Sequence, residues 1–466
     1  MMNPADSFFL KRYFVEGLAH ASYLFGADGA AAVVDPKRDV DDYLADAERA
    51  GLKIAAVFNT HPHADFASGF CEIAARTGAK VYTSHAARAS YDHVPARDGQ
   101  RVSIGSLEVE VLETPGHSPD SLSFLTRQAG CPVAVFTGDL LFVGDVGRPD
   151  LRDADADPGQ LADMLYDSLF SKILSLPADV KVHPAHGAGS LCGRALGSAP
   201  FTTVEQEKQF NWAAQLANRA EFRRQMLANL PERPAYFGFD VSLNLRGAAP
   251  WSELPPLRVL EEGGLARDGV VVIDTRAAPL FGAGHFPGSI NIGLGSAMFA
   301  TWSGFFVAGE SRIALAACSA DAAAKARLAL ARIGFDNVIG WLETEEFQKA
   351  QQLSQLSVHD LQIGLSRGDA PLVLDVRTAG EWQNGHIEGA RHIPLPALPR
   401  RMAEVPRDRS VAVICAGGYR SSIAASLLAR AGWRRVANVM GGMSAYHESY
   451  IEDWQAADLV FAGEYI

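Results

Sequence analysis

The sequence has few cysteines and no long apolar run. Its five cysteines are scattered along 466 residues, at Cys71, Cys131, Cys192, Cys318 and Cys415, and do not make a disulfide framework. No run approaches the roughly 18 apolar residues that a membrane-spanning helix needs. The first residues hold no apolar core long enough for a signal peptide. These absences predict a cytoplasmic protein with reduced thiols and no membrane partner.

Positively charged residues are in the minority. The chain has 42 Lys and Arg against 54 Asp and Glu, a formal net charge of -12. This balance argues against broad binding to nucleic acid or to anionic membranes. Hydrophobic residues make up 48% and charged residues 21%, as in an ordinary globular protein with sizeable cores. At roughly 150 residues per domain, the length predicts about three domains.

Residues 1–235 have the pattern of a layered α/β domain. Helical stretches alternate with β-rich runs that each end just before a candidate ligand, at 31–34, 55–58, 109–112 and 133–137. This alternation predicts an αββα arrangement. A long amphipathic helix over about 204–230 closes the domain. Prolines at 234, 250, 255 and 256 then indicate a linker.

The second half contains an internal repeat. An Asp-x-Arg core occurs at Asp274 and again at Asp375, and a Gly-His turn occurs at His285 and again at His386. Both pairs are offset by 101 residues (375 minus 274, and 386 minus 285). A period near 100 residues indicates a domain duplication rather than a solenoid. We therefore expect two copies of one α/β domain, at residues 236–352 and 353–466.

A metal-binding signature lies at residues 60–66, Thr-His-Pro-His-Ala-Asp-Phe. The pattern His-x-His-x-Asp-His furnishes ligands for two metals, but its last histidine is here Phe66, which cannot coordinate. Further ligand types follow at strand ends, next to Gly or Pro: His117, Asp139 and His186. A single histidine of this kind is more often structural, but this ordered set indicates a site for zinc, iron or manganese. One metal is expected to remain and the second to be lost.

Residues 1–230 resemble the metallo-β-lactamase superfamily. The segments 137–142 (Thr-Gly-Asp-Leu-Leu-Phe) and 147–150 (Gly-Arg-Pro-Asp) are similar to persulfide dioxygenases within it. The resemblance implies one non-haem Fe(2+) held by His61, His117 and Asp139, with O2 as co-substrate. Such a face leaves about three iron positions open. It also implies that Asp65 and His186 match ligands of a lost second metal, and that His63 tunes the site from outside the ligand set.

Two further residues in this half are open to two interpretations. Arg148 either binds a substrate carboxylate or shapes its loop through an ion pair. Cys192, six residues after His186 in a glycine-rich segment, is either a small buried hydrophobe or a catalytic thiol that accepts or returns persulfide sulfur.

A strand pattern at 411–414 leads directly into Cys415-Ala416-Gly417-Gly418-Tyr419-Arg420, followed by an Ala-rich helix. This places a thiol beside the backbone N–H groups of a helix N-terminus, which favour a thiolate and an anionic substrate at Gly417 and Gly418. Arg420 adds a positive charge and a planar fork of donors. Residues from about 355 to 466 resemble a rhodanese sulfurtransferase domain, which implies that Cys415 carries sulfane sulfur as a persulfide.

The first copy departs from this pattern. A gapless comparison that matches residue 334 with residue 432 puts Ala317 opposite Cys415 and Ala322 opposite Arg420. Cys318 is one position late, and Asp321 brings a negative charge where an anion would bind. This copy is interpreted as a degenerate rhodanese-like module without sulfur-transfer activity.

The leading hypothesis is a bifunctional sulfur enzyme in sulfide detoxification. Its first domain would oxidise a thiol persulfide, of glutathione or a similar carrier, to sulfite and thiol. Its last domain would exchange sulfur with sulfite and thiosulfate. The alternative is a zinc-dependent, glyoxalase II-like hydroxyacylglutathione hydrolase with an accessory rhodanese domain. A third hypothesis treats the repeated modules as binding domains. The sequence leaves open whether the chain forms a homo-oligomer.

Overall fold

The computed structural model describes residues 8–152, 156–216, 218–228, 230, 232–262, 265, 269–344, 347 and 350–448. The chain divides into two compact units. Unit 1 comprises residues 1–255, 304–309 and 328–336, and unit 2 comprises the remainder. Among the described residues, no helix is both long enough and apolar enough to cross a membrane. The domain boundaries at 235 and 352 stay predictions.

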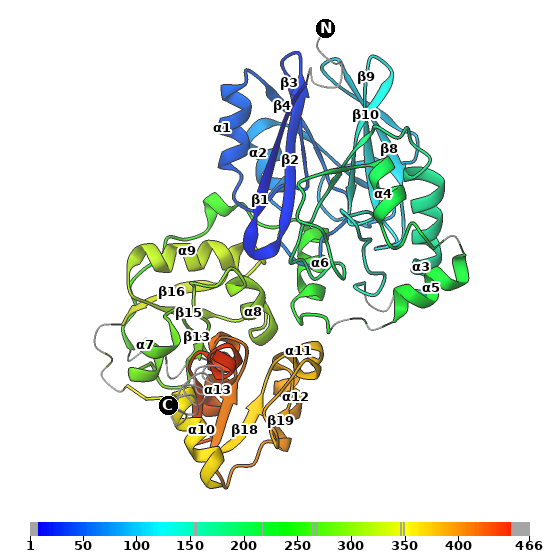
Figure 1. Ribbon diagram of the computed structural model, residues 1–466. Helices are drawn as coiled ribbons and strands as arrows, with labels where there is room; N and C mark the ends of the chain where they lie inside the picture. The colour runs from blue at the N-terminus through cyan, green and yellow to red at the C-terminus, as the bar shows by residue number, and fades with distance from the viewer. Residues whose placement is uncertain are drawn as a thin grey trace, which may run out of the picture. The chain divides into compact units, whose positions relative to one another are not determined.

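Unit 1 contains two six-stranded sheets packed face to face (Figure 1). The first has the order β1 (Phe9–Val15), β2 (His20–Ala27), β3 (Ala30–Val34), β4 (Lys53–Phe58), β5 (Lys80–Ser84) and β6 (Val94–Ala96). The second has the order β12 (Thr202–Thr203), β11 (Lys181–Pro184), β10 (Cys131–Gly138), β9 (Leu122–Gln128), β8 (Leu107–Glu113) and β7 (Arg101–Ile104). Large aromatic side chains from both sheets, including Phe25, Phe58, Phe124 and Phe136, form one buried core between them.

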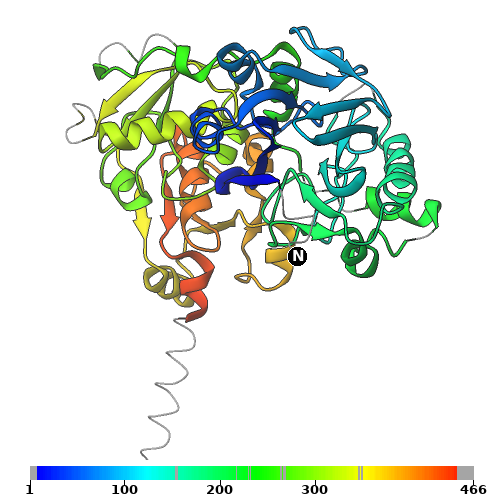
Figure 2. The ribbon, with the colours of Figure 1, turned by 90° about the horizontal axis from the view of Figure 1, so that it is seen from above.

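Helices cover the outer face of each sheet. On the first sheet, α1 (Asp41–Arg49) and α2 (Phe70–Thr77) bury Tyr43 and Ile73 against Val33 and Val57. On the second lie α3 (Pro158–Asp167), continued by the π-helical turn η3 (Ser168–Ile173), and α5 (Arg219–Leu227). Figures 1 and 2 place α1 and α3 on opposite outer sides of the two sheets. The predicted αββα arrangement is confirmed.

The prediction of one long helix over 204–230 is wrong. The segment forms two short helices, α4 (Val204–Phe210) and α5, with non-helical residues between them. Asn211 ends α4 with extended backbone angles, and its side chain binds Asp145 O rather than continuing the helix. Asn218 then caps α5 by accepting from two backbone N–H groups. Asparagine competes with helical hydrogen bonding in this way, and the helical spacing of apolar residues does not show it. Unit 1 also contains α6 (Phe237–Arg246) and η4 (Trp251–Glu253).

Unit 2 contains two parallel sheets. The first has the order β14 (Ile290–Asn291), β13 (Val271–Asp274), β15 (Ile313–Ala317) and β16 (Val338–Glu343). The helices along this stretch are α7 (Ala278–Ala283), α8 (Phe299–Phe306) and α9 (Ala320–Ala331), of which the last residues of α8 and α9, from 304 and from 328, belong to unit 1. The second has the order β17 (Ser354–Leu356), β21 (Val436–Val439), β20 (Val411–Ile414), β18 (Leu372–Asp375) and β19 (Arg391–His392). Its helices are α10 (Val358–Arg367), α11 (Ala379–Gln383), α12 (Leu398–Arg401) and α13 (Tyr419–Arg430), with the 3-10 turns η6 (Leu395–Ala397) and η7 (Met402–Glu404).

The sequence repeat has the same local structure in both copies. In the first copy, Arg276 pairs with Asp274 and donates to Gly284 O at 2.7 Å. In the second, Arg377 pairs with Asp375 and donates to Gly385 O, also at 2.7 Å. The histidine of each Gly-His turn stacks on an aromatic ring four residues earlier, His285 on Phe281 and His386 on Trp382. The repeated motif therefore fixes the turn after α7 in the first copy and after α11 in the second.

Candidate metal centre and candidate thiol site

The predicted metal ligands converge at one edge of the unit 1 sandwich. His61 follows β4, His117 follows β8, and Asp139 follows β10. All three are buried, with 4%, 2% and 2% of their surface exposed. One possible ligand atom from each lies within 4.8 Å of the others. The structure thus brings together the residues that the sequence analysis selected.

The atoms at the centre of this cluster have no partner within the described protein. His61 Nε2 lies 3.9 Å from Asp139 Oδ2, and His117 Nε2 lies 3.5 Å from the same oxygen. Both His61 Nε2 and Asp139 Oδ2 are buried without a hydrogen bond. Leaving buried polar atoms unpaired costs about 1–3 kcal/mol each. A cation between the two histidines and the carboxylate would satisfy them, so the donor set fits a metal.

The orientation of His61 is fixed by its neighbours. Thr60 Oγ1 donates to Asp35 Oδ2 at 2.8 Å and lies 3.1 Å from His61 Nδ1. Because its only proton goes to Asp35, this hydroxyl accepts a hydrogen bond from His61 Nδ1. The lone pair of His61 is therefore on Nε2, which points at Asp139. Such outer contacts orient metal-binding histidines in many proteins. The sequence analysis missed Asp35, although it follows the 31–34 strand run.

Charge around Asp139 favours its carboxylate form. Burial alone would raise the pKa of Asp139, but the nearby His186, His117 and His61 hold that pKa well below its usual range. Burial lowers the pKa of His61 and of His117, which favours the neutral imidazoles that metals require.

The second predicted set, His63, Asp65 and His186, is also within 4.8 Å. Each ring nitrogen of His186 lies close to a carboxylate. Nδ1 is 2.8 Å from Asp139 Oδ1, and Nε2 is 2.8 Å from Asp65 Oδ2. Burial opposes its protonation, yet the two carboxylates raise the pKa of His186 well above the usual value. Nδ1 of His186 is hydrogen-bonded to Asp139, whereas Nε2 has only the ion-pair contact with Asp65, so a metal at this second set would compete with the carboxylate contacts of His186. His63 Nε2 lies 3.3 Å from Asp35 Oδ1, outside the first set.

Phe66 stands at the sequence position of the last histidine in the signature, where a seventh ligand-type residue would be. Its ring centroid lies 4.4 Å from that of His63 and 3.7 Å from that of His20, on which it stacks. His20 is itself 1% exposed, and its Nε2 lies 3.0 Å from Asp35 O. His20 was not selected from the sequence, since nothing in its neighbourhood resembles a ligand motif.

Arg148 and Cys192 flank the same region. Arg148, 2% exposed, donates to Asp150 at 2.7 and 2.6 Å, so the ion-pair interpretation describes its geometry. The preceding Gly147 is required by space, because a Cβ there would lie 1.9 Å from Asp139 O. Cys192 is buried, and its sulfur lies within 4.8 Å of ligand atoms of Asp139 and His186. Burial, reinforced by Asp65 and Asp139, raises the pKa of the Cys192 thiol well above its usual value.

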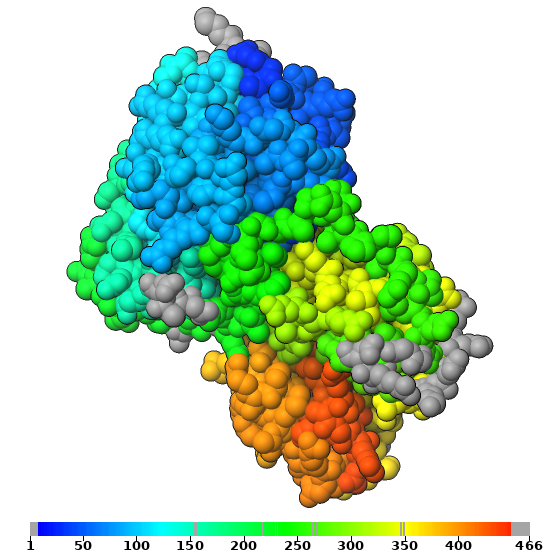
Figure 3. Space-filling view, turned by 180° about the vertical axis from the view of Figure 1, so that it is seen from behind, coloured from blue at the N-terminus to red at the C-terminus, as the bar shows by residue number. Residues whose placement is uncertain are grey.

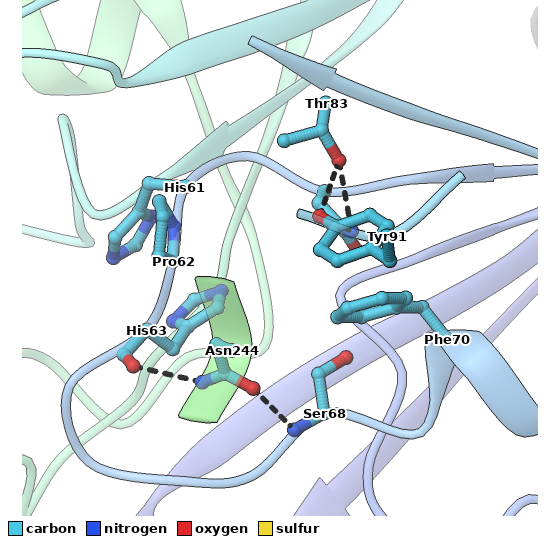
Figure 4. Close-up of a pocket in the computed structure, with 9 residues that line it drawn as sticks. His61, Pro62, His63, Ser68, Phe70, Thr83, Tyr91 and Asn244 are labelled. Atoms are coloured by element: carbon cyan, nitrogen blue, oxygen red, sulfur yellow. Dashed lines mark hydrogen bonds between the residues drawn. The ribbon is translucent and has the colours of Figure 1, made fainter. Parts of the chain in front are cut away.

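A small cavity lies beside the loop of residues 60–69, which carries the metal-binding signature (Figure 4). His61 and His63 reach it from one side, and Thr83 and Tyr91 form a hydrogen-bonded pair on the other. Asn244, from α6, bridges the two ends of the loop segment at the base of the view.

The thiol site in unit 2 follows β20. Cys415 is 1% exposed, and its Sγ accepts a hydrogen bond from the Gly418 N–H at 3.1 Å. Gly418 has the left-handed φ of 93° and precedes α13, which has no side-chain cap. Ser421 Oγ lies 3.3 Å from the sulfur. A sulfur anion at this position would therefore lie where uncapped helix N–H groups and the helix dipole are favourable.

Arg420 forms an ion pair that was not predicted from the sequence. Its guanidinium donates to both carboxylate oxygens of Glu381, at 2.8 and 2.6 Å. The hydrogen bonds from Arg420 lower the pKa of Glu381 from 4.5 to about 2, although partial burial opposes the shift. Glu381 was missed, but Thr378 and Glu381 have capping-box spacing, and both capping hydrogen bonds are present.

Strand register tests the comparison of the two copies. Asp274 pairs with Ala316 across β13 and β15, and Asp375 pairs with Ile414 across β18 and β20. Residue 317 is therefore the first residue after this pair in the first copy, as Cys415 is in the second. This is the match that the gapless sequence comparison predicted. Ala317 is fully buried, whereas Cys318 is exposed.

Comparison with known proteins agrees with this organisation. Residues 15–186 match the metallo-beta-lactamase superfamily, and residues 357–449 match the rhodanese-like domain. A crystal structure of a metallo-beta-lactamase from Staphylococcus aureus subsp. aureus COL is 30% identical, with a TM-score of 0.66, covering 72% of this chain and 99% of that one. The chain belongs to the metallo-beta-lactamase superfamily. It also carries a rhodanese-like domain.

Two curated relatives represent different activities. A hydroxyacylglutathione hydrolase from Francisella tularensis subsp. novicida (strain U112) is 32% identical over 179 residues, which are 38% of this chain and 67% of that protein. The mitochondrial persulfide dioxygenase ETHE1 of Bos taurus is 28% identical over 230 residues, 48% of this chain and 83% of that protein. The likeness alone does not choose between them.

Proposed function

We propose that unit 1 is a persulfide dioxygenase. We also propose that the rhodanese-like domain transfers sulfane sulfur to sulfite, the product of that reaction. The first reaction is RSSH + O2 + H2O → RSH + SO3²⁻ + 2 H⁺. Both oxygen atoms of O2 and the oxygen of water end on the terminal sulfur, which is oxidised as O2 is reduced. The thiol of glutathione or a similar carrier is the leaving group.

The observation that carries this proposal is Phe66 stacked on His20 where a binuclear site would have a ligand. His186 is engaged by two carboxylates beside it, so the His61, His117 and Asp139 face is the better metal site. When bound there, iron supplies redox chemistry with O2, which zinc does not. The likeness to the persulfide dioxygenase of Bos taurus supports the same assignment.

The chain's own residues have separate parts in this scheme. His61, His117 and Asp139 would hold the metal, and Thr60 and Asp35 keep the Nε2 lone pair of His61 directed at it. Buried groups around the ligands limit access of bulk water. Arg148, held by Asp150, shapes the loop that passes Asp139. The alternative role for Arg148 is binding of a substrate carboxylate, and we keep it as part of the proposal.

Cys192 remains a proposed second thiol. Its place beside Asp139 and His186 supports contact with persulfide sulfur, whereas its raised pKa means that it is a neutral thiol near pH 7. Replacement by serine tests this role. If Cys192→Ser leaves both turnover and the ratio of products unchanged, Cys192 is only a packing residue.

Sulfur transfer would take place at Cys415. The step is Cys–S–S⁻ + SO3²⁻ → Cys–S⁻ + S2O3²⁻, in which the sulfane sulfur bonds to sulfite and the cysteine thiolate leaves. The Gly418 N–H already points at Sγ, and Gly417 leaves open space beside the loop. Arg420, oriented by Glu381, would attract the sulfite anion. We propose that residues 236–352 are a degenerate rhodanese-like module, since Ala317 stands in place of the nucleophile.

The second candidate function is hydrolysis of glutathione thioesters. It is favoured by the close set of His63, Asp65 and His186 and by the likeness to the hydroxyacylglutathione hydrolase. Metal analysis with activity assays separates the two. About one iron per chain with O2 uptake that requires persulfide supports the dioxygenase. About two zinc ions per chain with thioester cleavage would contradict it.

A further inference from the structure

The middle of the metal-binding loop (residues 60–69) takes its backbone hydrogen bonds from a distant part of the chain, whereas Thr60 and Gly69 at the two ends bond to Asp35, Leu122 and Pro36. Between residues 63 and 67, four backbone groups have a partner among the described residues, and all four partners lie beyond residue 235. These bonds join His63 O, Asp65 O, Phe66 O and Ala67 N to Asn244, Tyr236 and Arg332. All of these residues belong to unit 1. The sheets that carry the ligands supply none of the four.

Asn244 makes the largest share of these contacts. Its Nδ2 donates to His63 O at 2.8 Å, and its Oδ1 accepts from Ser68 N at 2.9 Å (Figure 4). Nδ2 also donates to Phe66 O at 2.7 Å. Both amide hydrogens and the oxygen are therefore used, which is nearly the full capacity of an asparagine. The side chain is 3% exposed. Asn244 thus bonds to residues 63–68 where a strand partner would otherwise do so.

Other contacts hold α6 and residues 328–336 against the same part of unit 1. Tyr236 Oη donates to Asp65 O at 3.3 Å, and Ser90 N donates to Leu245 O at 2.9 Å. Arg332 donates to both carboxylate oxygens of Asp39, at 2.7 and 2.8 Å. In the space-filling view, a green surface lies directly against a blue one, so segments of unit 1 that are far apart in the sequence adjoin there (Figure 3). The residues that bond to the loop are therefore themselves held in place by other contacts within unit 1.

Loss of these bonds would act on the metal ligands through the backbone. Removing the Asn244 side chain leaves two buried carbonyl groups and one N–H group without partners. The loop then lowers its free energy by rearranging so that these groups bond to water or to other polar groups. The loop carries His61, and Asp65 bonds to His186 within it. A rearrangement would move these side chains relative to Asp139. Changes in groups that orient metal ligands typically cost 10–100-fold in metal affinity.

We propose that Asn244 is a positioning residue that holds residues 63–68 in the shape required for metal binding, with Tyr236 in a supporting part. The proposal concerns the metal site and holds for either reaction considered above. Its failure is therefore distinguishable from failure of the proposed function, because metal affinity is measured apart from turnover.

The test uses the full chain, stripped of metal and titrated with Co(II) against a chelating indicator. Asn244→Asp keeps the shape and the acceptor but loses both donors, and Asn244→Ala loses all three bonds. We expect Co(II) affinity to fall about 10–100-fold in both, with a changed visible spectrum of the bound Co(II). Asn211→Ala is the matched control, because this fully buried amide also donates twice, to Asp145 O at 3.0 Å and to Glu207 at 2.7 Å. Its Co(II) affinity should stay within about threefold of wild type, with the spectrum unchanged.

Folding is checked by circular dichroism of each metal-free protein. A folded Asn244→Asp that binds Co(II) within threefold of wild type overturns the proposal, as does an equal loss in Asn211→Ala. If both Asn244 variants fail to fold, Tyr236→Phe decides, since it removes one hydroxyl only. A fall of about threefold or more with a spectral change supports the proposal. An unchanged affinity and spectrum overturn it.

Discussion

Phe66 lies flat against His20, with ring centroids 3.7 Å apart and ring planes inclined by 26°. Both side chains are 1% exposed. The contact packs the metal-binding loop onto β2, which begins at His20. The residue that replaces a metal ligand is therefore also part of the core beneath the loop.

Restoring the missing ligand should change the metal content. In Phe66→His, an imidazole lies beside His63, Asp65 and His186, and we expect zinc content to rise from about one toward about two per chain. Persulfide-dependent O2 uptake should fall because His186 is drawn into the second site. Metal analysis after growth in zinc checks the first expectation. Phe66→Leu, which removes the ring without adding a donor, should not increase the zinc content.

Thr60 should matter for metal binding although it is not a ligand. Thr60→Val removes the hydroxyl that accepts from His61 Nδ1 and donates to Asp35. We expect a loss of about 10–100-fold in metal affinity. Thr60→Ser keeps the hydroxyl and should restore most of it. Equal affinity of the valine and serine variants would show that the hydroxyl does not orient His61.

The two modules of unit 2 should respond differently to loss of their cysteines. Cys415→Ser should abolish thiosulfate formation from sulfite while leaving persulfide-dependent O2 uptake at the wild-type rate. Cys318→Ser should change neither, because Ala317 holds the position equivalent to Cys415. Mass spectrometry after incubation with thiosulfate should find a persulfide on Cys415 only. A persulfide on Cys318, or loss of sulfite formation in Cys415→Ser, contradicts the assignment.

The Glu381–Arg420 pair should contribute a pH-dependent part of stability. Its folded pKa is lowered from 4.5 to about 2, so the contribution is present above pH 4.5 and is lost as the pH falls toward 2. Glu381→Gln removes this titration. The difference in Tm between wild type and Glu381→Gln should therefore be largest above pH 4.5 and shrink below it. A difference that stays constant over this range would show that the carboxylate charge is not what stabilises the pair.

The sequence predicted the layers of unit 1 and the metal-binding face because these depend on local pattern. Apolar runs at 55–58, 109–112 and 133–137, which end before His61, His117 and Asp139, imply strands that deliver side chains to one edge, and such strands are present. The gapless comparison likewise placed Ala317 opposite Cys415, and the pairing of β13 with β15 matches that of β18 with β20.

The remaining features depend on contacts between residues far apart in the chain. Asn244 and His63 are 181 positions apart, and no local motif connects them. The pairing of Arg420 with Glu381 spans 39 positions. The break between α4 and α5 depends on Asn211 binding Asp145 O, which no helical periodicity reveals. In each case a polar side chain bonds to a backbone group or a charged group that is far away in the sequence. Neither the composition nor a local sequence pattern predicts such a bond.

The contacts of Asn244 set a lower limit on how much of this chain can be transplanted. Residues 15–186 resemble a widespread superfamily and hold every proposed metal ligand. A protein engineer who moved that stretch into another host would carry the ligands but leave behind the partners of His63 O, Asp65 O, Phe66 O and Ala67 N. A portable form of the metal centre that keeps these bonds is therefore longer than residues 15–186, because it includes Tyr236, Asn244 and Arg332.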